Sequence, residues 1–126
     1  MELIKKLFGI EEKRRDLKIN WINLSEDSQL MDIETSKRVL GIFKHSTRCF
    51  TSKIVLKEFE NNFELSSNQI EMYYLDLIAY RNISDEIERK YGIRHESPQL
   101  LIIKNNKVVT HASHSRIIQL KLETYS

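Results

Sequence analysis

The only cysteine of this sequence, Cys49, lies between a short apolar run and a segment with helical periodicity. A thiolate is a nucleophile, and the unpaired N–H groups at a helix N-terminus stabilise an anion. Ser52 follows three residues later on the same helix face, so the spacing is that of a C-x-x-C redox motif with a hydroxyl replacing the second thiol. Arg48 and Lys44 add positive charge nearby. The pattern favours a reactive thiol, but many free cysteines are simply small buried residues, so both interpretations stay open at this point.

Pro98 is the only proline, and it stands between the polar segment 94–97 and an apolar run that begins at Gln99. A proline at this place usually marks the beginning of a strand. By itself it indicates a boundary and no chemistry.

The four histidines, together with the cysteine, could be drawn as a metal site. No Cys-x-x-Cys or His-Glu-x-x-His spacing is present, and these are the spacings that zinc sites use. His111 and His114 are three residues apart, which on a strand points them to opposite faces. A C-G-F-S iron–sulfur motif lacks its glycine here, and His45 with Cys49 forms a poor protease dyad because a strand-to-helix turn holds both. We predict no metal site.

The elements that position these residues follow from periodicity and from turn residues. The sequence predicts five strands, at 19–24, 39–43, 70–77, 99–103 and 108–112, from short apolar or alternating runs. It predicts four helices, at 25–36, 49–62, 82–91 and 115–123, from apolar residues at helical spacing. Helices separate the early strands and a hairpin ends the sheet, so we expect an α/β fold whose central mixed β-sheet is flanked by helices on both faces.

Caps and turns refine these boundaries. The expected N-caps of the first three helices are Ser25, then Ser46 or Thr47, then Asn82 or Ser84. The side chains of such residues accept hydrogen bonds from the first free N–H groups of a helix. Gly92 is expected to end its helix in the left-handed conformation. Asn105–Asn106 suits a tight hairpin turn. Asp76, inside a predicted strand, is expected to cap a turn, since a buried unpaired carboxylate is rare.

Composition limits the function classes. Hydrophobic residues make up 40% and charged residues 30% of the 126 residues, with one proline. This composition excludes collagen-like and disordered chains. The net charge of +2 does not indicate a nucleic-acid partner. No apolar run is long enough to span a membrane. A lone cysteine favours a reducing, cytoplasmic location.

The N-terminal segment 1–18 is predicted to be a leader outside the domain at 19–126. It has no apolar core region of a signal peptide. The residues of one stripe of a short amphipathic helix are Leu3, Ile4, Leu7 and Phe8. This stripe suits packing on the domain or fraying more than membrane anchoring.

Three separated motifs resemble one known family. The segments Phe43–Cys49, His95–Gln99 and His111–His114 are similar to the bacillithiol-system redox proteins of the YtxJ type, the monothiol bacilliredoxins. The resemblance runs from about Trp21 to the C-terminal helix and implies a thioredoxin-like fold. In such folds a cis-proline at the start of the strand faces the redox cysteine, and Pro98 stands in that place.

The resemblance implies an oxidoreductase that removes bacillithiol from protein mixed disulfides. It makes Cys49 the attacking thiolate and places the substrate on Thr47, Arg48, Ser52, Ser97 and Pro98. It implies no tightly bound cofactor, with bacillithiol as co-substrate and S-thiolated client proteins as partners. Without a second cysteine, an outside thiol must resolve the adduct.

One position departs from the family pattern. Proline usually follows the cysteine, whereas this chain has Phe50. Phe50 restores an N–H close to the sulfur and adds an apolar side chain at the rim of the site. Two alternatives remain open: a non-catalytic binding or sensor domain that is itself thiolated, and a reductase for glutathione-type adducts.

Overall fold

A five-stranded mixed sheet with the order β1-β3-β2-β4-β5 forms the centre of the fold in this computed structural model, which describes residues 19–126. The predicted leader over 1–18 lies outside the described residues. The strands are β1 (Ile22–Asn23), β2 (Leu40–His45), β3 (Glu71–Asp76), β4 (Gln99–Lys104) and β5 (Lys107–Ser113). β3 pairs in parallel with β1 and β2, while β4 runs antiparallel to β2 and β5.

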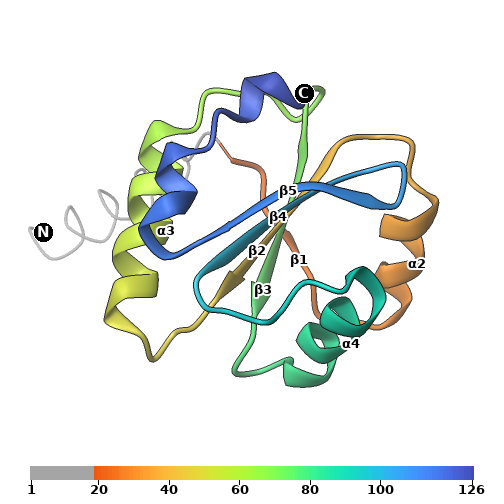
Figure 1. The fold of residues 1–126 in the computed structure, drawn as a ribbon, viewed down its shortest axis with the longest axis horizontal. Coiled ribbons are helices and arrows are strands. Elements are labelled where there is room, and N and C mark those ends of the chain that lie inside the picture. The colour runs from red at the N-terminus through yellow and green to blue at the C-terminus, as the bar shows by residue number, and fades with distance from the viewer. Residues whose placement is uncertain (1–18) are drawn as a thin grey trace, which may run out of the picture.

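Helices cover both faces of this sheet (Figure 1). The helices α2 (Ser28–Thr35) and α4 (Arg81–Tyr91) lie on one side, and α3 (Phe50–Asn62) lies on the other with the 3₁₀ segment η1 (His114–Gln119). A second 3₁₀ segment, η2 (Leu122–Thr124), follows. The predicted α/β class with helices on both faces is confirmed.

Two hydrophobic cores, one on each face, hold these layers together. Phe43 and Ile102 point toward α3 and pack with Phe59, whereas Ile42 and Leu101 point to the opposite face, which α2 and α4 cover. Because strand residues alternate between faces, the central strands bury side chains on both sides. β2 is buried at each of its six positions, so its last residues are fixed as firmly as its first.

Several local predictions are confirmed. Gly92 ends α4 at φ 68°, in the left-handed conformation, and its N–H donates to the carbonyl of Glu88. Asn105 and Asn106 have φ values of 52° and 60° in the hairpin turn. Asp76 Oδ1 accepts N–H groups from the turn that follows its strand, at 3.0 and 3.3 Å.

Strand bounds differ from the prediction by a residue at several ends and by more in β1 and β2. β2 continues through Lys44 and His45, beyond the predicted end of the strand at residue 43, because pairing with β3 extends to Asp76. The first strand shrinks to Ile22–Asn23, since only these residues find a partner, on β3. Non-local pairing, rather than side-chain polarity, determines where each strand ends.

The predicted C-terminal helix and the N-caps are wrong. Two 3₁₀ segments replace the helix at 115–123, and Leu120 between them is extended at ψ 130°. This break lets Ile117 and Leu122 both enter the core beside α3. The N-caps of α2, α3 and α4 are Asp27, Cys49 and Tyr80, in place of the predicted serines, threonine and asparagine, and no cap side chain bonds the helix.

Candidate active site

Cys49 is the N-cap residue of α3, directly after the turn that leaves β2. Its N–H donates to the carbonyl of Ser46 at 3.2 Å, and its own carbonyl accepts the N–H of Lys53 at 3.1 Å. The side chain is partly exposed. The thiol therefore lies at a helix N-terminus, where free N–H groups and the helix dipole favour an anion.

The Ser52 side chain connects the first turn of α3 to the end of β2 through hydrogen bonds. Its side chain is fully buried, and its Oγ lies 2.8 Å from Nδ1 of His45 and accepts the N–H of Ser46 at 3.1 Å. These two bonds hold the loop that carries the thiol. The hydroxyl faces the interior in this structure, and its predicted contact with substrate stays a prediction.

His45 is a buried partner of this loop. Burial lowers the pKa of its imidazole below the usual value, and the carboxylate of Asp76 opposes this only in part. Its ring also lies 5.7 Å from the ring of Tyr74. A neutral imidazole can accept or donate at Nδ1, according to its tautomer, so it can share a proton with the Ser52 hydroxyl.

A second polar group lies on the opposite face of β2, under α4. The Lys44 side chain is fully buried, and its Nζ lies 3.4 Å from the Ser84 carbonyl. Burial lowers its pKa from 10.5 to about 8, although Glu88 and Asp85 favour the charged form. The Ser84 hydroxyl continues the contacts to Nδ1 of His95, at 2.9 Å. This chain of contacts ties the end of β2 to the loop that precedes β4.

Pro98 lies at the same end of the sheet as Cys49. Lys44 pairs with Gln99 between β2 and β4, so the proline stands beside the last residue of β2. The Ser97–Pro98 peptide bond is cis, and the Pro98 carbonyl accepts the N–H of His114 at 2.9 Å. Among residues 19–126, nothing bonds the buried hydroxyl of Ser97.

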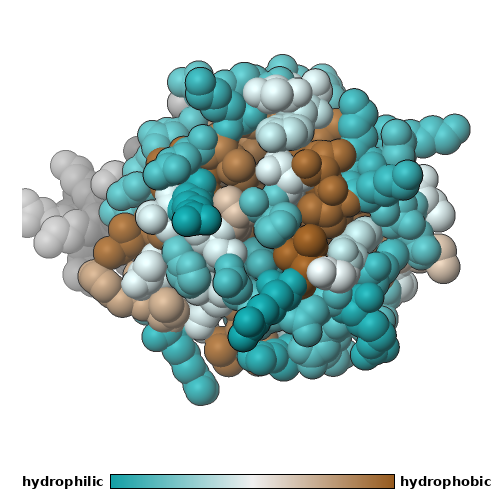
Figure 2. Space-filling view, viewed as in Figure 1, coloured by the Kyte–Doolittle hydropathy of each residue, from teal (hydrophilic) through white to brown (hydrophobic). Residues whose placement is uncertain are grey.

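The turn before the thiol and the helix after it are open to solvent. Thr47 and Arg48 are exposed. Phe50 is 76% exposed and Ile54 is 43% exposed, one helical turn apart on the same side of α3. Figure 2 shows hydrophobic side chains over the start of α3 at the lower left. The structure thus gathers the predicted site residues Thr47, Arg48 and Cys49 in one turn.

The described part of the chain carries no group of three or more His, Cys, Asp or Glu side chains arranged for a metal ion. His111 and His114 both line one open groove, against the expectation of opposite faces. β5 ends at Ser113, and His114 then turns away at φ 56°, so strand alternation no longer separates the two rings. Within residues 19–126, no helix is both long and apolar enough to cross a membrane.

Comparison with known proteins agrees with this geometry. The model of the family described as monothiol bacilliredoxin BrxC matches residues 22–122. The chain belongs to the monothiol bacilliredoxin family. A solved structure with a thioredoxin fold has 29% sequence identity and a TM-score of 0.70, with 84% of this chain and 94% of that chain covered. Membership in this family supports a thiol redox protein, and Cys49 is the only cysteine of the sequence.

More distant structures share the fold alone. The thioredoxin of Trypanosoma brucei brucei has 13% identity and a TM-score of 0.69, with 88% of this chain and 95% of that chain covered. The Malassezia sympodialis thioredoxin has 20% identity and a TM-score of 0.64, with coverages of 82% and 84%. The thioredoxin-like fold that the resemblance implied is confirmed.

Sequence reasoning missed the buried partners of the site. The predicted strand ended at residue 43, directly before Lys44 and His45. One feature of the sequence could have indicated their burial: both residues directly follow an apolar run. A strand that is buried on both faces can include polar residues at its end when other groups form hydrogen bonds with them. The partners, on α3 and α4, could not be identified before the sheet was assembled.

Proposed function

We propose that this bacilliredoxin is a monothiol oxidoreductase that removes bacillithiol from protein mixed disulfides through Cys49. The supporting observation is a single, partly exposed thiol at the N-terminus of α3. Ser52 stands where a dithiol enzyme would carry its second sulfur, and its hydroxyl is buried and bonded. Such a site can form a mixed disulfide and cannot close an internal one.

The reaction is a thiol–disulfide exchange in two steps. The Cys49 thiolate attacks the bacillithiol sulfur of the client adduct, the client–bacillithiol S–S bond breaks, and the client leaves as a thiolate. An outside thiolate then attacks the Cys49–bacillithiol disulfide, which frees Cys49 and forms a disulfide between the outside thiol and bacillithiol. The client is reduced, and the outside thiol supplies the electrons.

The surface beside the thiol supports a protein client. Phe50 and Ile54 expose apolar area next to Cys49, and exposed apolar patches of this kind often mark protein-binding surfaces. Arg48, the residue directly before Cys49, is exposed and adds a positive charge to this surface. We place the reaction in the cytoplasm, because a lone unpaired cysteine suits a reducing compartment.

The test uses a model protein whose single thiol carries bacillithiol. Mass spectrometry should show that its thiol is freed while Cys49 gains the bacillithiol mass, and that added free thiol makes the release catalytic. Cys49→Ser and Cys49→Ala should both be inactive. Release that stops after one equivalent in excess free thiol would instead indicate a thiolated sensor, and no transfer at all would overturn the proposal.

A further inference from the structure

A polar groove lies between the end of β5 and the loop that leads into β4. Its volume is about 440 Å³, and Glu96, His111, Ser113, His114 and Arg116 line it. The catalytic scheme described above uses none of these side chains. They come from two segments that the sequence separates and the sheet brings together, since Ser113 pairs with Gln99.

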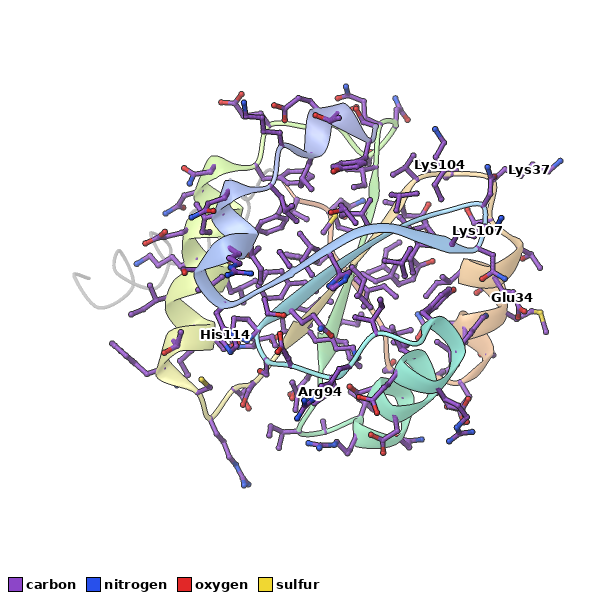
Figure 3. All side chains as sticks on the ribbon, viewed as in Figure 1. Glu34, Lys37, Arg94, Lys104, Lys107 and His114 are labelled. Carbon is purple, nitrogen blue, oxygen red and sulfur yellow. The ribbon has the colours of Figure 1, made fainter. Side chains whose placement is uncertain are left out.

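The groove opens at the same end of the sheet as the thiol. The N–H of His114 donates to the Pro98 carbonyl at 2.9 Å, which ties one wall of the groove to the proline of the candidate site. η1, which begins at His114, packs against α3, the helix that begins after Cys49. Figure 3 shows His114 at the end of β5 near the first turn of α3, with Arg94 on the loop after α4.

The groove presents charges of both signs. The pKa of the Glu96 carboxyl is lowered below its usual value. The main cause is a hydrogen bond from Ser113, and the nearby His114, Arg94 and His111 add to it. Arg116 is exposed, and it is absent from the four ion pairs found among residues 19–126. A guanidinium binds a carboxylate through two parallel hydrogen bonds, and an ionised carboxylate such as that of Glu96 binds an ammonium group.

The backbone of His114 is held in an uncommon conformation here. Its φ of 56° lies in the left-handed region, which only a few per cent of non-glycine residues adopt. His114 and His111 both line the groove beside this turn. Strain of this kind is frequent where a protein holds a ligand.

We propose that this groove binds the part of a zwitterionic low-molecular-weight thiol that lies beyond its sulfur. Arg116 holds a carboxylate of that thiol, and Glu96 holds its ammonium group. The inference rests on the proposed function, because the bound thiol is the one whose sulfur Cys49 attacks. Binding in the groove positions that sulfur, and the exchange itself is unchanged.

The test measures transfer to Cys49 from one model protein that carries different thiols in mixed disulfide. The adducts are those of cysteine (both charges), 3-mercaptopropionate (carboxylate alone), cysteamine (ammonium alone) and 2-mercaptoethanol (neither). Each variant rate is divided by the wild-type rate for the same adduct, so the intrinsic reactivity of the adduct cancels. Arg116→Gln should slow the two carboxylate adducts about tenfold, and Glu96→Gln should slow the two ammonium adducts similarly, since charge-assisted bonds are worth roughly 1.5–3 kcal/mol.

Both variants should transfer the 2-mercaptoethanol adduct at the wild-type rate. Arg89→Gln and Glu86→Gln are matched controls, because they make the same charge changes in an exposed ion pair on α4, and they should alter no rate. If the variants slow every adduct equally, or slow none, the proposed binding of the thiol in the groove is wrong. Transfer by the wild type would in that case still support the proposed exchange reaction at Cys49. Failure of the wild type to react with any adduct would overturn both proposals.

Discussion

At the scale of the residue, the loop that carries Cys49 depends on the hydroxyl of Ser52. That hydroxyl is buried and bonded both to the imidazole of His45 and to the N–H of Ser46. A buried polar group stabilises the fold only while its partners remain, since each lost partner leaves a desolvated group unpaired. The side chain that replaces a resolving thiol is therefore a positioning residue for the turn.

Ser52→Ala should lower the free energy of unfolding by about 1–3 kcal/mol, because the Ser46 N–H and the His45 ring then lose a buried partner. Urea denaturation measures this. Ser67→Ala, at an exposed position, is the control and should change stability by less than about 0.5 kcal/mol. Equal effects of the two variants would contradict the role of the Ser52 bonds.

Ser52→Cys should convert the site into one that resolves its own adduct. The introduced thiol can attack the Cys49 sulfur of a Cys49–bacillithiol disulfide, form an internal disulfide and release bacillithiol. Mass spectrometry should then show a short-lived adduct without added thiol, whereas the adduct of Ser52→Ala should persist. An adduct that persists equally in both variants would show that position 52 cannot reach the sulfur.

At the scale of the element, the backbone at the start of α3 suits proline at position 50 better than the phenylalanine that is present. Phe50 is the first residue of α3, and Cys49 before it is extended at φ −103° and ψ 119°. Proline favours this conformation in the residue that precedes it. The first helical N–H has no partner inside the helix, so little is lost when it is removed.

Phe50→Pro should raise the free energy of unfolding by about 0.4–1 kcal/mol, because proline restricts the unfolded chain and fits the folded one. Denaturant unfolding measures the change. Lys53→Pro is the matched control: it removes the N–H that bonds the Cys49 carbonyl at 3.1 Å and should cost about 3 kcal/mol. A loss of stability in Phe50→Pro would mean that this phenylalanine contributes packing that its 76% exposure does not reveal.

At the scale of the whole molecule, a buried lysine lowers the stability of the folded protein. Lys44 is fully buried between the sheet and α4, and burial lowers its pKa from 10.5 to about 8. Between these two pH values the unfolded chain holds a proton that the folded chain has released, so the stability of the protein rises with pH in that range. Below pH 8 both states carry the proton, and the cost of the buried charge is complete.

Lys44→Met should therefore raise the free energy of unfolding at pH 7, by up to about 3 kcal/mol. The difference from wild type should shrink between pH 8 and 10.5, where the native lysine becomes neutral. Denaturation at several pH values tests this, with Lys104→Met, at an exposed position, as the control. A difference that does not change with pH would show that packing, and not charge, sets the cost.

Local sequence patterns were sufficient to predict the strand-to-helix junction at Cys49, the hairpin turn and the end of one helix. The apolar run before Cys49 and the helical spacing after it predicted a thiol at a strand-to-helix junction, and the structure has this junction. The hairpin at Asn105–Asn106 and the Gly92 cap were predicted from the conformations that these residues tolerate, and both are present. Each of these features depends on neighbours close in the chain.

Features that depend on distant partners were decided by the tertiary structure. β2 keeps Lys44 and His45 because β3 pairs with them, and the interior accepts their polar groups because Ser84 and Ser52 meet them. His111 and His114 line one groove because β5 ends between them. The sequence by itself determined the place of the single thiol, between a strand and a helix. Only the assembled sheet determined its buried partners and the groove beside it, because hydrogen-bond partners far apart in the chain meet only after the strands pair.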